Sequence, residues 1–129
     1  MEPGLDLDCS ITSLTSSGNN YVAGIEATAG STTIDRNNIN TLNNSSTNTY
    51  GAFGINLNGG NNDVVLNNFV AGITGDMTGG AAFSTTLGII GIRVGSGTGH
   101  KVYHNSINLF GLRSGLSSSS LLGAAFALV

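Results

Sequence analysis

The sequence predicts an all-β solenoid, in which the chain winds repeatedly through short strands that stack on one another. Three observations predict this fold class. The 129 residues include 20 Gly, and Asn, Ser and Thr fill most polar positions, a composition that disfavours helices. Isoleucine, valine and leucine recur between turns rich in Gly, Asn and Ser. The chain also repeats itself, as stacked repeat architectures do.

The first strand of the repeat is a glycine followed by an aliphatic residue. Its three copies are GIEA (24–27), GINL (54–57) and GIRV (91–94). Positions two residues apart point to the same side of a strand, so two aliphatic columns are expected along the stack. They are Ile25, Ile55 and Ile92, and Ala27, Leu57 and Val94. The residues between them, Glu26, Asn56 and Arg93, are expected to form a polar surface face.

The second block of the repeat is TIDRNNI (33–39), DVVLNNF (63–69) and KVYHNSI (101–107). It predicts a third aliphatic column of Ile34, Val64 and Val102 and a fourth of Ile39, Phe69 and Ile107. It also predicts a structural asparagine ladder of Asn37, Asn67 and Asn105. Asparagines can hydrogen-bond from one layer to the next in stacked β structures, and they tolerate sharp corners.

The spacing of the copies predicts where the length of the repeat varies. Gly24 to Asn37 and Gly54 to Asn67 are each 13 positions apart, whereas Gly91 to Asn105 are 14 apart, which places one extra residue in the turn 95–100. The opening glycines are 30 and then 37 residues apart, so most of the variation falls in segments 43–51 and 75–88. A solenoid of three to four windings with variable loops on one side is therefore expected.

Partial copies flank the three complete ones. SITSL (10–14) matches NINTL (38–42), and GAAFALV (123–129) has the composition of another opening strand. We expect residues 1–129 to form a single segment excerpted from a longer repeat array. Neither end carries a polar cap, which predicts end-to-end self-association through unpaired strands.

These repeats resemble those of the right-handed parallel β-helix, the pectate-lyase-like architecture. The resemblance spans about residues 10–129, and GIRVGSGTGHKVYHNSINLFG (91–111) is similar to repeats of large bacterial secreted and cell-surface proteins. It implies the fold and a secreted or cell-surface location, with any signal or sorting segment outside this chain. It does not imply an activity, because lyases, hydrolases, adhesins and spacers share the repeat.

Composition argues against several classes of partner. Charged residues make up 9% of the chain and the net charge is −3, so nucleic-acid binding, which needs clustered Lys and Arg, is not expected. No apolar stretch approaches the ~18 residues of a membrane span. Cys9 is the one cysteine, which rules out an intrachain disulfide and a cysteine metal cluster.

No catalytic, cofactor-binding or metal-binding residues are expected. His100 and His104 have a spacing found in some zinc sites, but no partnering cysteine or acid accompanies them. The GSGTG segment (95–99) precedes a β block, whereas a phosphate-binding loop precedes a helix. The acidic residues do not pair within the columns, although a glycan-cleaving site needs two carboxylates.

The sequence therefore favours a non-catalytic structural or adhesive segment of a secreted or cell-surface bacterial protein, with a polar flank that contacts glycan or another surface protein. The alternative is a fragment of a carbohydrate-active enzyme, a polysaccharide lyase or hydrolase, whose catalytic cluster would come from flanking sequence. The enzyme question stays open at this point.

Overall fold

A computed structural model describes residues 9–46, 51–75, 88–109 and 123–129, which form strands and their connections without a helix. The strands are β1 (Ser10–Ser16), β2 (Val22–Ala27), β3 (Thr33–Asp35), β4 (Asn38–Asn44), β5 (Ala52–Asn61), β6 (Val64–Leu66), β7 (Phe69–Gly75), β8 (Ile89–Thr98), β9 (Lys101–Tyr103), β10 (Ser106–Asn108) and β11 (Gly123–Leu128).

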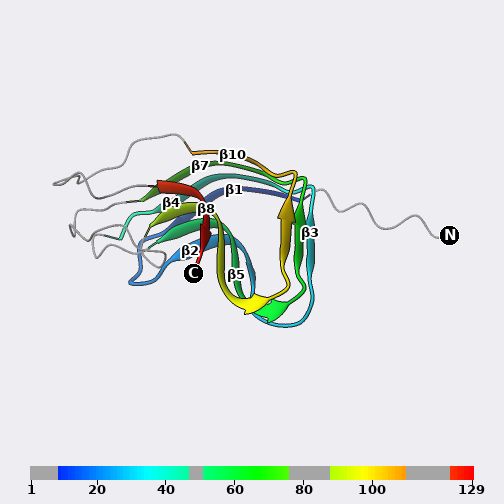
Figure 1. The fold of residues 1–129 in the computed structure, drawn as a ribbon. Coiled ribbons are helices and arrows are strands. Elements are labelled where there is room, and N and C mark those ends of the chain that lie inside the picture. The colour runs from blue at the N-terminus through cyan, green and yellow to red at the C-terminus, as the bar shows by residue number, and fades with distance from the viewer. Residues whose placement is uncertain (1–8, 47–50, 76–87, 110–122) are drawn as a thin grey trace.

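The strands form three parallel sheets. Sheet A has the order β1-β4-β7-β10, sheet B the order β2-β5-β8-β11 and sheet C the order β3-β6-β9. The chain visits sheets B, C and A in turn, so β2–β4, β5–β7 and β8–β10 make three successive windings, numbered 1 to 3 here (Figure 1). This all-β arrangement is compatible with a parallel β-solenoid.

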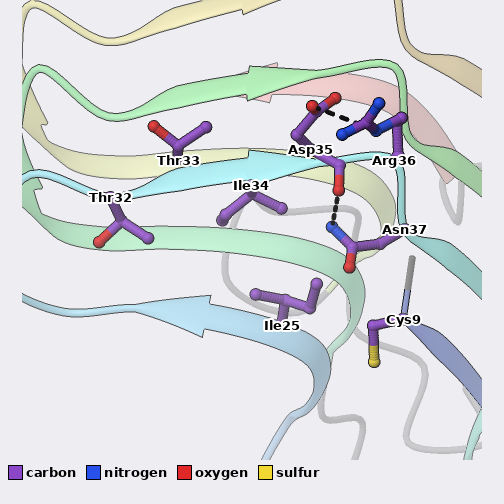
Figure 2. A pocket seen from close by; sticks show the side chains of 8 residues that line it. All are labelled: Cys9, Ile25, Thr32, Thr33, Ile34, Asp35, Arg36 and Asn37. Atoms are coloured by element: carbon purple, nitrogen blue, oxygen red, sulfur yellow. Dashed lines mark hydrogen bonds and ion pairs between the residues drawn. The ribbon is translucent and has the colours of Figure 1, made fainter. Parts of the chain in front are cut away.

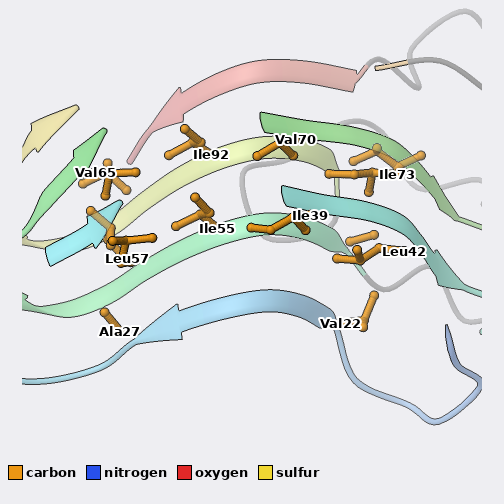
Figure 3. Packing of buried hydrophobic residues seen from close by; sticks show 14 residues of the cluster. Val22, Ala27, Ile39, Leu42, Ile55, Leu57, Val65, Val70, Ile73 and Ile92 are labelled. Carbon is orange, nitrogen blue, oxygen red and sulfur yellow. The ribbon is translucent and has the colours of Figure 1, made fainter. Parts of the chain in front are cut away.

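The aliphatic columns predicted on the first strand are confirmed. Ile55 pairs with Ile25 on one side and Ile92 on the other, and Leu57 likewise pairs with Ala27 and Val94. Ile55, Leu57 and Ile92 are completely buried. Figure 3 shows Ile92 stacked over Ile55 and Val70 stacked over Ile39, with the two pairs facing each other from sheets B and A. Like residues from successive windings thus build one apolar core.

The glycine that opens each repeat is required by the close approach of sheet A. A Cβ atom on Gly54 would lie 2.6 Å from the carbonyl oxygen of Gly91 and would collide with the Val70 side chain. A Cβ on Gly24 would lie 2.7 Å from both the Gly54 oxygen and Ile39 Cγ2. Any larger residue here would push the windings or the sheets apart.

The third and fourth columns differ from the predicted register by one residue in winding 2. Val65, not Val64, lies between Ile34 and Val102. Val70, not Phe69, lies between Ile39 and Ile107. Since side chains alternate between the two faces of a strand, this single step turns Phe69 outward, where it is 43% exposed, and buries Val70 completely.

The physical reason lies at the end of β5. From Leu57 to Val64 and from Val94 to Lys101 the chain takes the same number of residues, whereas Ala27 to Thr33 is one shorter. The extra residue therefore enters between windings 1 and 2, in the stretch from Leu57 to Val64, and not between windings 2 and 3. The doublets Val64-Val65 and Asn67-Asn68 conceal the shift, because either member of each fits the repeat.

Both partial copies take the positions predicted for them. Ile11 and Leu14 of β1 pair with Ile39 and Leu42 of β4. At the other end, β11 adds to sheet B beside β8. The predicted variable segments 43–51 and 75–88 both lead from sheet A back to sheet B, and much of each lies outside the described residues.

We predict that truncating Val70 costs more stability than truncating its larger neighbour. Val70→Ala removes a fully buried side chain and should lower the free energy of unfolding by about 2 kcal/mol. Phe69→Ala should cost at most about 1 kcal/mol, because much of that ring is already in water. Chemical denaturation of both variants measures the difference. A loss of about 3–5 kcal/mol for Phe69→Ala would instead favour the register with Phe69 in the core.

Candidate functional site

Glu26, Asn56 and Arg93 lie in one column of sheet B, as the spacing predicts, but only Glu26 is exposed. Asn56 is completely buried and Arg93 is 7% exposed. The Asn56 amide donates to Glu26 Oε1 over 2.8 Å and accepts from Arg93 Nη1 over 2.9 Å. This column is therefore an internal polar chain, and only its Glu26 end faces solvent.

The burial of this column has a structural cause, because the outer side of sheet B is also covered. Phe53, Ile90 and Ala127 form a second buried apolar cluster there, and the Arg93 guanidinium lies 5.4 Å from the centre of the Phe53 ring. The sequence carried a signal for this: the segments AFGINL and IIGIRV are almost continuously apolar, as strands buried on both faces are.

Glu26 also receives a hydrogen bond from Tyr21 at the edge of the same face. The Tyr21 hydroxyl donates to Glu26 Oε1 over 2.5 Å. This hydrogen bond, then partial burial and the carboxylate charge, raise the pKa of Tyr21 above its ordinary value of 10.0, and the Arg93 charge opposes the rise. The tyrosine thus remains a neutral donor that holds the exposed end of the column.

The asparagine ladder exists, with Asn68 in its middle position in place of Asn67. The side-chain oxygen of Asn68 accepts from the Asn37 backbone and side-chain nitrogens over 2.9 and 2.8 Å. The backbone and side-chain nitrogens of Asn68 in turn donate to Asn105 Oδ1, over 3.0 and 2.9 Å. The Asn68 side chain also donates to the Leu66 carbonyl oxygen. The ladder fastens all three windings at the corner between sheets C and A.

Asn67 has a different role at the same corner. With Arg36 and His104 it forms a stack of residues with positive φ, at 55°, 53° and 55° respectively. Its amide donates to Asp35 Oδ1 over 3.0 Å, on the outside of the winding. Asparagine tolerates both the left-handed backbone and the ladder position, which is why its identity alone does not reveal the register.

A second polar stack, which the sequence analysis missed, occupies the corner between sheets B and C. Asp63 is completely buried, and its Oδ1 accepts from the Thr32 backbone nitrogen of winding 1 over 2.7 Å. Its Oδ2 lies 3.0 Å from Nδ1 of His100 in winding 3, whose side chain is 6% exposed. The signal would have been an acid and a histidine at equivalent positions of adjacent windings, and the register slip concealed it.

The His100–Asp63 pair does not have the geometry of a catalytic dyad. The other ring nitrogen of His100, Nε2, lies 3.1 Å from the Ser96 carbonyl oxygen and therefore faces the protein. His104, in contrast, is exposed and contacts the Tyr103 ring edge-on at 5.2 Å. Among the described residues, no group of three or more His, Cys, Asp and Glu side chains could hold a metal ion.

The residues best suited to binding lie on the outer surface of the corner between sheets C and A, where they are partly or fully exposed. We call them the corner strip, which has three rows across the windings: Asp35, Leu66 and Tyr103; Arg36, Asn67 and His104; and Asn38, Phe69 and Ser106. Phe69 and Tyr103 are 43% and 42% exposed. The strip combines two accessible aromatic rings with amide, hydroxyl and charged groups.

The corner strip borders two recesses. One has a volume of about 450 Å³ and is lined by Cys9, Ser10, Arg36, Asn37, Asn38, Asn67 and Phe69. The other, of about 510 Å³, lies beside β3 and reaches Ile25 and Ile34 (Figure 2). Arg36 stands between them with its Nε 3.4 Å from Asp35 Oδ2. Cys9 is an exposed thiol at the border of both recesses.

No protein family, curated protein or solved structure matches this chain significantly. Among the described residues, no helix has the length and apolar character that a membrane-spanning helix needs. The functional interpretation therefore depends on the chemistry of the corner strip and its neighbours.

We predict that Asn68 is far more important for stability than Asn67. Asn68→Ala leaves buried donors of Asn37 without an acceptor, and should lower the free energy of unfolding by about 3 kcal/mol, the cost of unsatisfied buried groups. Asn67→Gly keeps the left-handed backbone accessible and should change stability by no more than about 0.5 kcal/mol. Thermal and chemical unfolding measure the stability of both variants. A larger loss of stability for Asn67→Gly than for Asn68→Ala would contradict the observed ladder.

Proposed function

We propose that this chain is a non-catalytic structural or adhesive segment of a secreted or cell-surface bacterial protein, folded as a right-handed parallel β-helix of the pectate-lyase-like type. In this proposal the stacked windings supply a stiff support and the corner strip contacts glycan. The observation that carries the proposal is the exposure of two aromatic rings on adjacent windings: Phe69, which lines a recess of about 450 Å³ among polar groups, and Tyr103.

The chemistry of the corner strip supports contact with sugars. An aromatic ring offers an apolar face that can lie against the C–H face of a sugar ring, while polar neighbours fix its orientation. Asn38, Asn67 and Ser10 offer amide and hydroxyl groups at the recess, and Arg36 offers a guanidinium. Phe69 and Tyr103 belong to adjacent windings, whose strands are spaced by about 4.8 Å.

The rigidity of the support follows from the way the windings are held together. Each winding hydrogen-bonds to the next through all three sheets, and both corners of sheet C carry polar side-chain stacks. Residues of the corner strip therefore sit at fixed backbone positions. A fixed site loses less conformational entropy when it binds than a mobile loop does.

The alternative, a fragment of a polysaccharide lyase or hydrolase, has one specific observation in its favour, the close His100–Asp63 pair. That pair is directed inward to the Ser96 carbonyl oxygen, which favours a structural role for it. Incubation of the chain with pectin and alginate, followed by absorbance of unsaturated products, separates the two functions. Turnover would support the enzyme and contradict the non-catalytic proposal.

We predict that the intact chain binds glycans on a mixed array of neutral and acidic oligosaccharides, and that the corner aromatics carry the binding. Phe69→Ala and Tyr103→Ala should each weaken the best interaction by about tenfold, equivalent to about 1.4 kcal/mol. Phe126→Ala is the matched control, because Phe126 is similarly exposed but lies on β11 of sheet B. Absence of any glycan binding, or equal weakening by Phe126→Ala, would contradict the proposal.

The unpaired edges of the described sheets support a second proposal, that these edges pair with further windings of the same kind. β11 is the last described strand of sheet B; its final residue, Leu128, is 72% exposed, and Val129 after it is 61% exposed. Edge strands of this kind pair with other chains unless charge or bulges prevent it. For the 129-residue chain studied alone, the partner would be a second copy.

We predict that the isolated chain associates in a concentration-dependent manner, seen by size exclusion with light scattering. Leu128→Lys should shift it toward the monomer, because a charge on an edge strand opposes pairing. Phe69→Lys, on the middle winding, should leave the association unchanged. A chain that remains monomeric at high concentration would contradict end-to-end pairing.

A further inference from the structure

We propose that His100 and Asp63 form a proton-dependent clasp that fastens winding 3 to windings 1 and 2, and that loss of the proton releases the turn 95–100. This turn consists of the last residues of β8 and the two residues that precede β9, and it is the yellow bend in Figure 1. The proposal goes beyond glycan contact and is independent of it, because the clasp lies at the other corner of sheet C.

Both ring nitrogens of His100 face oxygen atoms that cannot donate a hydrogen bond. Nε2 faces the Ser96 carbonyl oxygen at 3.1 Å, and Nδ1 faces Asp63 Oδ2 at 3.0 Å. A carbonyl oxygen only accepts hydrogen bonds, so Nε2 keeps its proton in the neutral ring and Nδ1 then directs a lone pair at the carboxylate. A second proton, on Nδ1, replaces this repulsion by an ion pair with Asp63.

Because both side chains are buried, loss of the proton from this pair costs free energy. The His100 side chain is 6% exposed and Asp63 is not exposed at all. Asp63 Oδ2 and His100 Nδ1 have no hydrogen-bond partner among the described residues, so their 3.0 Å approach acts as an ion pair when the ring is protonated. When the proton leaves, a buried carboxylate faces a nitrogen lone pair at a place that solvent does not reach, and an uncompensated buried charge costs free energy.

Asp63 belongs to winding 2 and contacts both windings 1 and 3, so the clasp connects all three windings. Its Oδ1 accepts from the Thr32 nitrogen of winding 1, and its backbone oxygen accepts from the Lys101 nitrogen of winding 3 over 2.8 Å. The turn itself depends on backbone that only glycine adopts readily, with Gly97 and Gly99 at φ 97° and 73°. It therefore has little intrinsic preference for its closed form.

Release of the turn would open an existing recess. Gly97, Thr98, Gly99 and His100 line a cavity of about 380 Å³, together with the apolar residues Val94, Val102, Phe126 and Leu128. Because the protonated pair holds the turn closed, the fastening is present at low pH and is lost as the pH rises and the proton dissociates.

The charged groups on the neighbouring elements do not replace this proton. Lys101 on β9 follows His100 directly and is exposed. Arg93 on β8 donates to Asn56 and Asn58 on sheet B. Asp35 on β3 contacts Arg36 at the opposite corner. In the described parts of these elements, Asp63 is the acidic group against the imidazole.

The test measures amide hydrogen exchange as a function of pH, with two histidine variants as a matched pair. In the unaltered chain, the protection factor of the Lys101 amide should fall by about tenfold or more between about pH 5.5 and pH 9. His100→Gln should show the low protection at both pH values, while His104→Gln, which alters an exposed histidine four residues away, should behave as the unaltered chain.

A second measurement does not depend on any variant folding. Nitrogen-15 chemical shifts of the His100 ring in the unaltered chain should report protons on both nitrogens at about pH 5.5, and one should be lost over the same pH range in which protection falls. Protection that is independent of pH, a ring that stays neutral throughout with the turn closed, or loss of the pH dependence in His104→Gln would each overturn the clasp.

Discussion

Each winding is joined to the next by parallel backbone hydrogen bonds in a fixed register, and the rest of the structure depends on that register. It stacks Ile25, Ile55 and Ile92 into one column and encloses them against sheet A. A displacement by one residue would exchange the inner and outer faces of a strand. The same register decides which asparagines form the ladder and which aromatic rings reach the surface.

Polar side chains reinforce the register where the backbone turns. At the corner between sheets C and A, Asn37, Asn68 and Asn105 bond to one another across the windings. At the corner between sheets B and C, Asp63 bridges Thr32 and His100. Corners are where backbone groups leave the sheet ladders, so polar side chains are needed there to satisfy buried donors and acceptors.

Much of the fold could be predicted from the sequence, because the repeat itself encodes it. The glycine that opens each copy, the columns through Ile55 and Leu57, and the partial copies at both ends were all evident from spacing. The third and fourth columns were not, since Val64-Val65 and Asn67-Asn68 let one added residue pass unnoticed. Sequence spacing locates a repeat, but only backbone pairing decides between two equivalent neighbours.

The candidate site was harder to predict for the same reason. The predicted register put Phe69 in the core, so the sequence did not indicate Phe69 as a surface residue or the corner strip around it. The outer face of sheet B was expected to be polar and solvent-facing, whereas Asn56 and Arg93 are buried beside Phe53. Burial on the second face of a sheet depends on what packs over it, which a single-strand pattern does not specify.

The register is tested most directly by nuclear Overhauser contacts between backbone protons of successive windings. Parallel pairing predicts contacts of Ile55 with both Ile25 and Ile92, and of Val70 with both Ile39 and Ile107. Contacts of Phe69 with Ile39 in place of Val70, or the close α-proton pairs typical of antiparallel strands, would contradict the stacked windings and the corner strip together.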